Sequence, residues 1–261
     1  MPRNCIIIGC PRSGTSLTAG TLADGPYFMG DQLYRSPAEI NWKGTFEDRE
    51  VNEINEELLA RSIDRHRHKL FNRLFRKERM RQIRVGQTQR WLIALPTNVT
   101  IVRPPDLLER IRALTARRPY CFKDPRFPYT FGVWRPLLHD PVMVCVFRSP
   151  ALTASSLVTV CNKPYYANLA MNFERGLKVW EYMYRHVLEI HYPRGGKWLF
   201  VHYDQVMQPA GRRRLADALD TVVDGSFADQ KLNRAQPAGE IPEHIEQLYR
   251  RLCDMAEYEA A

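Results

Sequence analysis

Short apolar runs separated by longer amphipathic stretches organise this chain. Two runs, Cys5–Ile8 and Val142–Phe147, are continuously apolar and rich in β-branched residues, which is typical of strands buried on both faces of a parallel sheet. Weaker strand patterns lead up to Lys123 and Asp204. Because helical periodicity separates these runs, we expect an α/β fold with a parallel sheet of four to five strands and helices on both faces.

The amphipathic stretches predict the helices. Residues 46–59 place Val51, Ile54, Leu58 and Leu59 at helical spacing behind an acidic first turn. Further helices are expected over residues 106–117, 172–190, 209–219 and 242–259. No repeat, low-complexity tract or linker divides the sequence. We therefore expect a single domain over residues 1–261, with a basic helical insertion at about 61–118.

The first apolar run leads into a loop suited to binding an anion. Gly9 and Pro11 end the strand, and Ser13-Gly14-Thr15 can turn directly into a helix from about Ser16 to Leu22. Such a strand–loop–helix turn is P-loop-like, because backbone N–H groups converge at the start of the helix. Side-chain donors are added by Arg12, Ser13, Thr15 and Ser16.

The spacing of this loop fits a Walker A motif, but one essential residue differs. Gly9 and Gly14 have the required separation, yet Thr15 stands where the motif needs a lysine that reaches the β- and γ-phosphates. The substitution argues against hydrolysis of a nucleoside triphosphate. It favours a ligand with a shorter anionic chain.

A second anion site is indicated after the strand that ends at Phe147. Arg148 follows that strand and offers a planar fork for phosphate. Pro150 suits the first turn of a helix, and Ser156 places a hydroxyl about two turns along it. Two separate anion sites in one chain would suit a nucleotide that carries a phosphate at each end.

These motifs together resemble the sulfotransferases that use 3′-phosphoadenosine 5′-phosphosulfate (PAPS). The run Pro11–Ser16 resembles their 5′-phosphosulfate loop, in the form with Arg that is similar to tyrosylprotein sulfotransferases and many bacterial members. Arg148, Pro150 and Ser156 match the Arg-x-Pro-(x)5-Ser pattern of the 3′-phosphate site. The resemblance implies transfer of a sulfuryl group from PAPS to a hydroxyl or amine, with adenosine 3′,5′-bisphosphate as product and no metal.

The resemblance also implies roles for individual residues. The 5′-phosphosulfate would lie against Arg12, Ser13, Gly14, Thr15 and Ser16, and the 3′-phosphate against Arg148 and Ser156. Members of the family often close over the nucleotide with basic residues of a late loop, which here suggests Arg234 or Lys231.

Lys123 is the candidate cation for the reacting groups. It ends a short apolar strand, at the edge where parallel sheets bind ligands, and Lys123-Asp-Pro is similar to the tyrosylprotein sulfotransferase segment whose lysine contacts the transferred sulfate. Since Thr15 leaves the Walker position without a cation, we expect Lys123, with Arg12, to stabilise negative charge during the reaction. Asp124 is placed to orient Lys123 or Arg126.

A sulfuryl acceptor loses a proton as it attacks, so a general base is needed. Glu47 is the first candidate, because related enzymes carry a Glu or His on the segment after the loop helix. Asp48 and Asp31 remain alternatives.

The net charge and the distribution of basic residues indicate which kinds of partner the protein could bind. Lys and Arg number 38 against 29 Asp and Glu, a net charge of +9, which suits an anionic ligand. Basic residues dominate a predicted amphipathic helix over 61–90. That helix could face an anionic acceptor, make peripheral contact with an anionic membrane surface, bind an acidic partner, or simply be a solvated charged face. No nucleic acid is expected, because aromatic residues are not interleaved with the basic ones.

Other sequence features limit the expected location of the protein and its expected cofactors. No apolar run is long enough to span a membrane and no signal peptide precedes the first strand, so we expect a cytoplasmic protein. The six cysteines are scattered without zinc-like spacing, and no metal site is expected.

Two alternatives remain beside a sulfotransferase. One is a P-loop kinase or NTPase, and the other is a non-catalytic basic binding protein. The acceptor stays open between a small molecule, a glycan, a lipid and a peptide tyrosine, and so does the oligomeric state.

Overall fold

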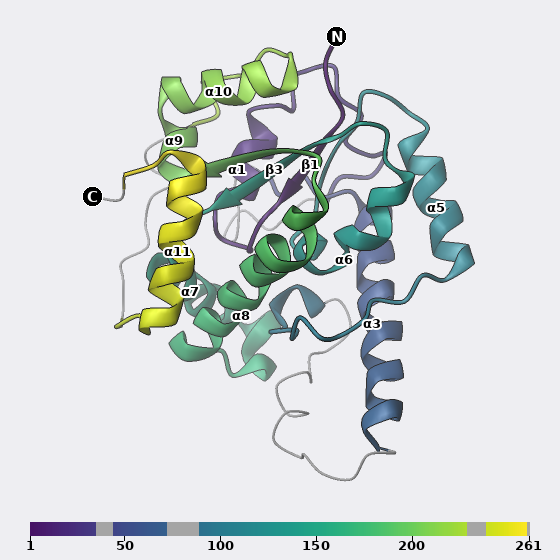
Figure 1. Ribbon diagram of the computed structural model, residues 1–261, viewed down its shortest axis with the longest axis vertical. Helices are drawn as coiled ribbons and strands as arrows, with labels where there is room; N and C mark the ends of the chain where they lie inside the picture. Colours follow the sequence, from purple (N-terminus) through teal and green to yellow (C-terminus); the bar gives the residue numbers. More distant parts are fainter. Residues whose placement is uncertain (35–43, 72–88, 229–238, 260–261) are drawn as a thin grey trace.

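A computed structural model describes residues 1–34, 44–71, 89–228 and 239–259. Within these residues the chain forms a four-stranded, all-parallel sheet in the order β2-β1-β3-β4 (Figure 1). The strands are β1 (Cys5–Ile8), β2 (Cys121–Lys123), β3 (Val142–Phe147) and β4 (Lys197–His202). The α/β prediction of a parallel sheet with four to five strands is confirmed, with four strands.

The central strands are apolar throughout because both of their faces are covered. On β1, Ile6 and Ile8 belong to one hydrophobic cluster, whereas Cys5 and Ile7 belong to another on the opposite face. Successive side chains of a strand point to opposite faces, so a continuous apolar run can fill two cores. All four residues are fully buried.

Helices cover both faces of the sheet (Figure 1). The larger core packs the sheet against α3 (Arg49–Phe71), α5 (Pro105–Thr115), α6 (Phe127–Trp134), α7 (Pro150–Cys161), α8 (Phe173–Arg185) and α11 (Glu243–Ala256). The smaller core packs the other face against α1 (Thr15–Gly20), α9 (Tyr203–Met207) and α10 (Pro209–Leu219). Helices on both faces are therefore confirmed.

Several short helical turns complete the fold. They are the 3-10 turns η1 (Arg90–Leu92), η2 (Arg135–Leu137), η3 (Pro164–Leu169) and η5 (Tyr192–Arg194), and the π-helix η4 (His186–His191).

The helix predicted over residues 172–190 changes type near its end. Its α-helical part, α8, ends at Arg185, and residues His186–His191 form a π-helix. The histidines at both ends of η4 are buried, and their ring Nε2 atoms bond to backbone carbonyls: His186 to Leu95 at 3.0 Å and His191 to Pro128 at 2.9 Å. Helical periodicity in the sequence does not predict such tertiary contacts, so it predicted one continuous helix here.

Two other predicted boundaries also moved. The basic segment 61–90 does not begin a helix of its own, because α3 runs without a break from Arg49 to Phe71, a stretch free of Gly and Pro; residues 72–88 lie outside the described residues. The last strand ends at His202 rather than Asp204, since the His202 ring accepts the backbone N–H of Asp204 at 3.2 Å and caps α9.

Candidate active site

The predicted site residues lie at the carboxyl edge of the sheet. β1 is flanked by β2 and β3, and each of these three strands ends at one predicted element. The loop with Arg12 follows β1, Lys123 ends β2, and Arg148 follows β3. Because the strands are parallel, all three elements meet at the same edge, where open parallel sheets bind ligands.

A hydrogen bond joins the two predicted anion sites, and together they make one candidate anion pocket. Arg12 Nε donates to Ser156 Oγ of α7 at 3.0 Å, so the loop after β1 contacts the helix after β3. Ser13 Oγ lies 3.3 Å from Thr153 Oγ1, one turn earlier on the same helix. Burial and the positive charge of Arg148 both lower the pKa of Arg12. Two guanidinium groups held this close favour an anion between them.

Tyr203 forms part of the same pocket, although the sequence motifs did not single it out. The guanidinium of Arg148 lies over its ring, 4.5 Å from the centroid. Tyr203 is only 5 % exposed, and no described residue bonds its buried hydroxyl. An unpartnered hydroxyl beside two arginines is suited to donate to a bound anion. The sequence signal for it is the Val201-x-Tyr203-Asp204 run at the end of a predicted strand, which resembles a run of the sulfotransferase family.

Gly14 is required by the way the loop approaches Tyr203. Its φ is +98°, a left-handed conformation that favours glycine. A Cβ at this position would lie 2.7 Å from Tyr203 Cδ2. The remaining residues of the loop follow directly, with Thr15 and Ser16 beginning α1. Arg234 and Lys231 lie outside the described residues.

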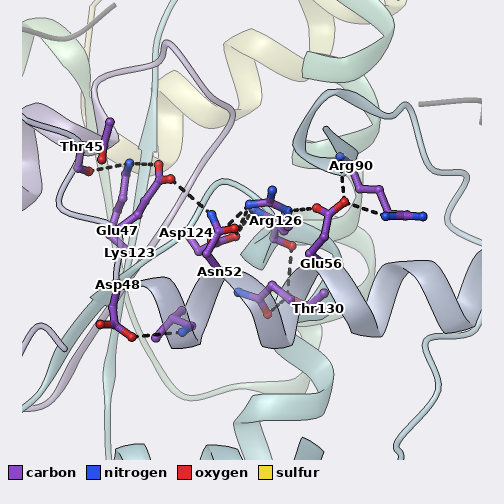
Figure 2. Close-up of polar contacts among 12 residues, drawn as sticks. Thr45, Glu47, Asp48, Asn52, Glu56, Arg90, Lys123, Asp124, Arg126 and Thr130 are labelled. Atoms are coloured by element: carbon purple, nitrogen blue, oxygen red, sulfur yellow. Dashed lines mark hydrogen bonds and ion pairs between the residues drawn. The ribbon is translucent and has the colours of Figure 1, made fainter. Parts of the chain in front are cut away.

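The predicted base and the predicted cation contact each other. Lys123 Nζ lies 2.5 Å from Glu47 Oε1 and donates to the Thr45 carbonyl at 2.8 Å (Figure 2). The Lys123 side chain is 4 % exposed and that of Glu47 is 17 % exposed. Glu47 lies just before α3, and Lys123 is the last residue of β2. Their pairing joins two elements that are far apart in the sequence.

The two alternative carboxylates have other partners. Asp48 Oδ1 accepts the backbone N–H of Val51 at 3.1 Å, and Oδ2 accepts that of Gln32 at 2.9 Å, so Asp48 caps α3 and holds the preceding segment. Asp31 is exposed and pairs with Arg117 at 2.5 Å. Among the three candidates, Glu47 is the one beside Lys123.

Asp124, the neighbour of Lys123, is fully buried. Its Oδ1 accepts the backbone N–H of Arg126 at 2.8 Å, and its Oδ2 lies 3.3 Å from Arg126 Nη1. Burial raises its pKa to about 7, with Glu47 adding to the rise and Arg126 opposing it. The site therefore contains a carboxyl group that changes charge near neutral pH.

Comparison with known proteins decides the family. The model of the Sulfotransferase family matches residues 4–221, which include every predicted site residue except Lys231 and Arg234. The chain belongs to the sulfotransferase family. A sulfotransferase is thereby supported over the kinase and binding-protein alternatives.

Solved sulfotransferase domains share this fold. The sulfotransferase domain from the curacin biosynthetic pathway is similar over 100% of this chain and 99% of its own, with 13% identity and a TM-score of 0.55. The sulfotransferase domain from the Synechococcus PCC 7002 olefin synthase is similar over 99% of this chain and 95% of its own, with 14% identity and a TM-score of 0.50. No curated protein sequence matches the chain.

Within the described ranges, no group of three or more His, Cys, Asp or Glu is arranged to hold a metal ion. Across the same ranges, every helix is too short or too polar to cross a membrane. The cytoplasmic location and the membrane contact through residues 61–90 stay predictions.

Proposed function

We propose that this sulfotransferase transfers a sulfuryl group from PAPS to a hydroxyl or amine. The observation that carries the proposal is the contact between the two predicted anion sites, in which Arg12 bonds to Ser156 and acts on Arg148, whose guanidinium lies over Tyr203. The partly buried Arg12, the buried Arg148 and a buried hydroxyl without a described partner suit an anionic ligand that reaches both sites. Arg12, Ser13, Gly14, Thr15 and Ser16 would hold its 5′-phosphosulfate, and Arg148 and Ser156 its 3′-phosphate.

In the proposed reaction, PAPS and the side chains of the protein have separate roles. When bound, PAPS supplies a sulfuryl group attached to a phosphate leaving group. Glu47 would accept the proton that the acceptor loses, and Lys123 and Arg12 would stabilise negative charge on the oxygens at the reacting end. In-line displacement of this kind needs mainly positioning and charge stabilisation, which buried residues on a sheet edge can provide.

The contact between Lys123 and Glu47 brings the proposed base next to the proposed cation. Lys123 Nζ lies 2.5 Å from Glu47 Oε1, so the proposed base and the proposed cation occupy neighbouring positions. An acceptor that hydrogen-bonds Glu47 would be held beside Lys123. Removing Glu47 should lower turnover by roughly 10²- to 10⁴-fold, since a general base contributes about that much.

Nucleotide binding tests the proposal without knowledge of the acceptor. Calorimetric titration with adenosine 3′,5′-bisphosphate, without metal, is expected to give binding that Arg12→Ala and Arg148→Ala each weaken at least tenfold, a loss of roughly 1.4 kcal/mol or more. Arg110→Ala is the matched control, because Arg110 of α5 pairs with Glu50 of α3 in a more exposed ion pair. Tighter binding of ATP with magnesium, or full binding by both variants, would refute the proposal.

The acceptor itself requires a screen. Small molecules, glycans, lipids and tyrosine peptides would be incubated with PAPS that carries radioactive sulfate, with Glu47→Ala as the negative control. Sulfation at the normal rate by that variant would remove Glu47 as the base.

A further inference from the structure

A chain of charged side chains runs to one side of the Lys123–Glu47 pair (Figure 2). We call Asp124, Arg126, Glu56 and Arg90 the buried ion chain. Asp124 pairs with Arg126 at 3.3 Å, Arg126 Nε pairs with Glu56 Oε2 at 2.6 Å, and Glu56 Oε1 pairs with Arg90 Nη1 at 2.7 Å. The Arg126 side chain is 1 % exposed and that of Glu56 is 12 % exposed. Charges of opposite sign thus alternate along its length.

The buried ion chain connects the two elements that carry the reacting side chains. Asp124 directly follows Lys123 at the end of β2, whereas Glu56 lies on α3, the helix that begins just after Glu47. Arg126 bonds to both Asp124 and Glu56. On the α3 side, the amide of Asn52 donates to Glu47 Oε2 at 3.5 Å, so Glu47 is also held to the first turn of this helix. Movement of α3 against β2 would separate Lys123 from Glu47, and Arg126 opposes that movement.

Stability alone is a weak reason for this arrangement. Charges inside a protein lose much of their hydration, and well-packed apolar side chains at the same positions are often as stable or more so. Arg126 and Glu56 therefore occupy costly positions. The charge of Arg126 acts on the buried Asp124, as do those of Glu47 and Lys123, and Glu56 acts on Arg126 in turn.

Resting on the proposed function, we infer that Arg126 and Glu56 are positioning residues of the active site. They hold α3 to the end of β2 and set the electrostatic potential at the Lys123–Glu47 pair. The other described groups that face this region are Asp124, Arg90 of η1, Asn52 of α3 and Tyr166 of η3, which interacts electrostatically with both Glu47 and Arg126.

Single and double charge removals test this inference. The titration of the Asp124 carboxyl group, which directly follows Lys123 in the sequence, is followed by ¹³C NMR in protein with labelled aspartate, and its signal is identified by its loss in Asp124→Asn. Arg126→Gln removes a positive charge and should move the midpoint to higher pH, by roughly half a unit or more. Glu56→Gln removes a negative charge and should move it to lower pH. In the double variant the two changes cancel, and the midpoint should return toward that of the wild type.

Matched controls come from a more exposed ion pair that joins α5 to α3. Arg110 and Glu50 pair at 2.6 Å with side chains 33 % and 40 % exposed, so their charges are screened by solvent. Arg110→Gln and Glu50→Gln should leave the Asp124 midpoint unchanged. A role that is only structural predicts damage that accumulates in the double Arg126/Glu56 variant, with no opposite shifts in the single variants.

The outcomes separate this inference from the proposed function. Unchanged midpoints, or shifts of the same sign in both single variants, would overturn the inference even if the wild type transfers sulfate. Adenosine 3′,5′-bisphosphate should bind all these variants normally, because its pocket lies between β1 and α7. Failure of the wild type to bind it refutes the proposed function instead. If Arg126→Gln does not fold, the shift to lower pH in Glu56→Gln decides the matter.

Discussion

At the scale of single residues, the candidate site holds charged side chains that are buried or lie next to a like charge. Asp124 has no exposed side-chain surface, and its one cationic partner, among those the structure describes at hydrogen-bond distance, is Arg126. Arg12 and Arg148 are neighbours of like charge, and burial lowers the pKa of both. Each case places a charge where it is unfavourable without a partner. Such positions are typical of sites that bind or transfer charged groups.

Asp124 should make the fold less stable as the pH rises. Burial raises its pKa to about 7, above that of an exposed Asp, so the folded chain holds this proton more tightly than the unfolded chain. Its contribution to stability is therefore complete at pH values below about 4 and is lost as the pH rises through about 7. Asp124→Asn cannot lose that proton. Scanning calorimetry from pH 5 to 8.5 should show the variant gaining stability relative to the wild type as the pH increases; parallel curves would contradict this.

At the scale of elements, the loop between β1 and α1 depends on one glycine. Gly14 combines a left-handed backbone with a close approach to Tyr203. The ring of Tyr203 lies in turn under Arg148, which follows β3. The loop, the start of α9 and the end of β3 thus fit together around the nucleotide pocket.

Gly14→Ala should therefore damage stability and binding together. Strain at this φ costs about 1–2 kcal/mol, and the added methyl group would push against the Tyr203 ring 2.7 Å away. We expect a lower Tm and loss of adenosine 3′,5′-bisphosphate binding in calorimetry. Gly195→Ala is the control, since Gly195 has φ +76° but open space around its Cβ position. It should lower Tm and keep binding; normal binding by Gly14→Ala would show that the loop is not part of the pocket.

At the scale of the molecule, one ligand should stabilise the whole fold. The proposed nucleotide would contact the loop after β1, the middle of α7 and the residue after β3, joining segments from both halves of the chain. Because a ligand that binds only the folded state shifts the unfolding equilibrium, adenosine 3′,5′-bisphosphate at about 100 times its Kd should add roughly 2.7 kcal/mol and raise Tm by about 5–10 °C. EDTA should leave the shift intact. A shift that requires magnesium and ATP instead would favour the kinase alternative.

Much of the fold and of the candidate site could be predicted from the sequence. The continuous apolar runs at Cys5–Ile8 and Val142–Phe147 indicated strands covered on both faces, and the structure confirms them as the central strands. The residues around Arg12, Lys123 and Arg148 were found because each follows or ends a strand in a recognisable local pattern. Parallel strands then bring those patterns to one edge, which is a consequence of topology that the order of elements already implies.

Other features became visible only in three dimensions. Tyr203 resembled the end of a strand, Arg126 and Glu56 had no distinguishing motif, and the pairing of Glu47 with Lys123 joins positions in different elements. Local patterns encode apolar periodicity, turns and anion-binding loops, because those depend on near neighbours along the chain. Which carboxylate faces the lysine, and which buried charges neutralise one another, depend on how α3 packs against the end of β2, and tertiary structure alone decides that packing.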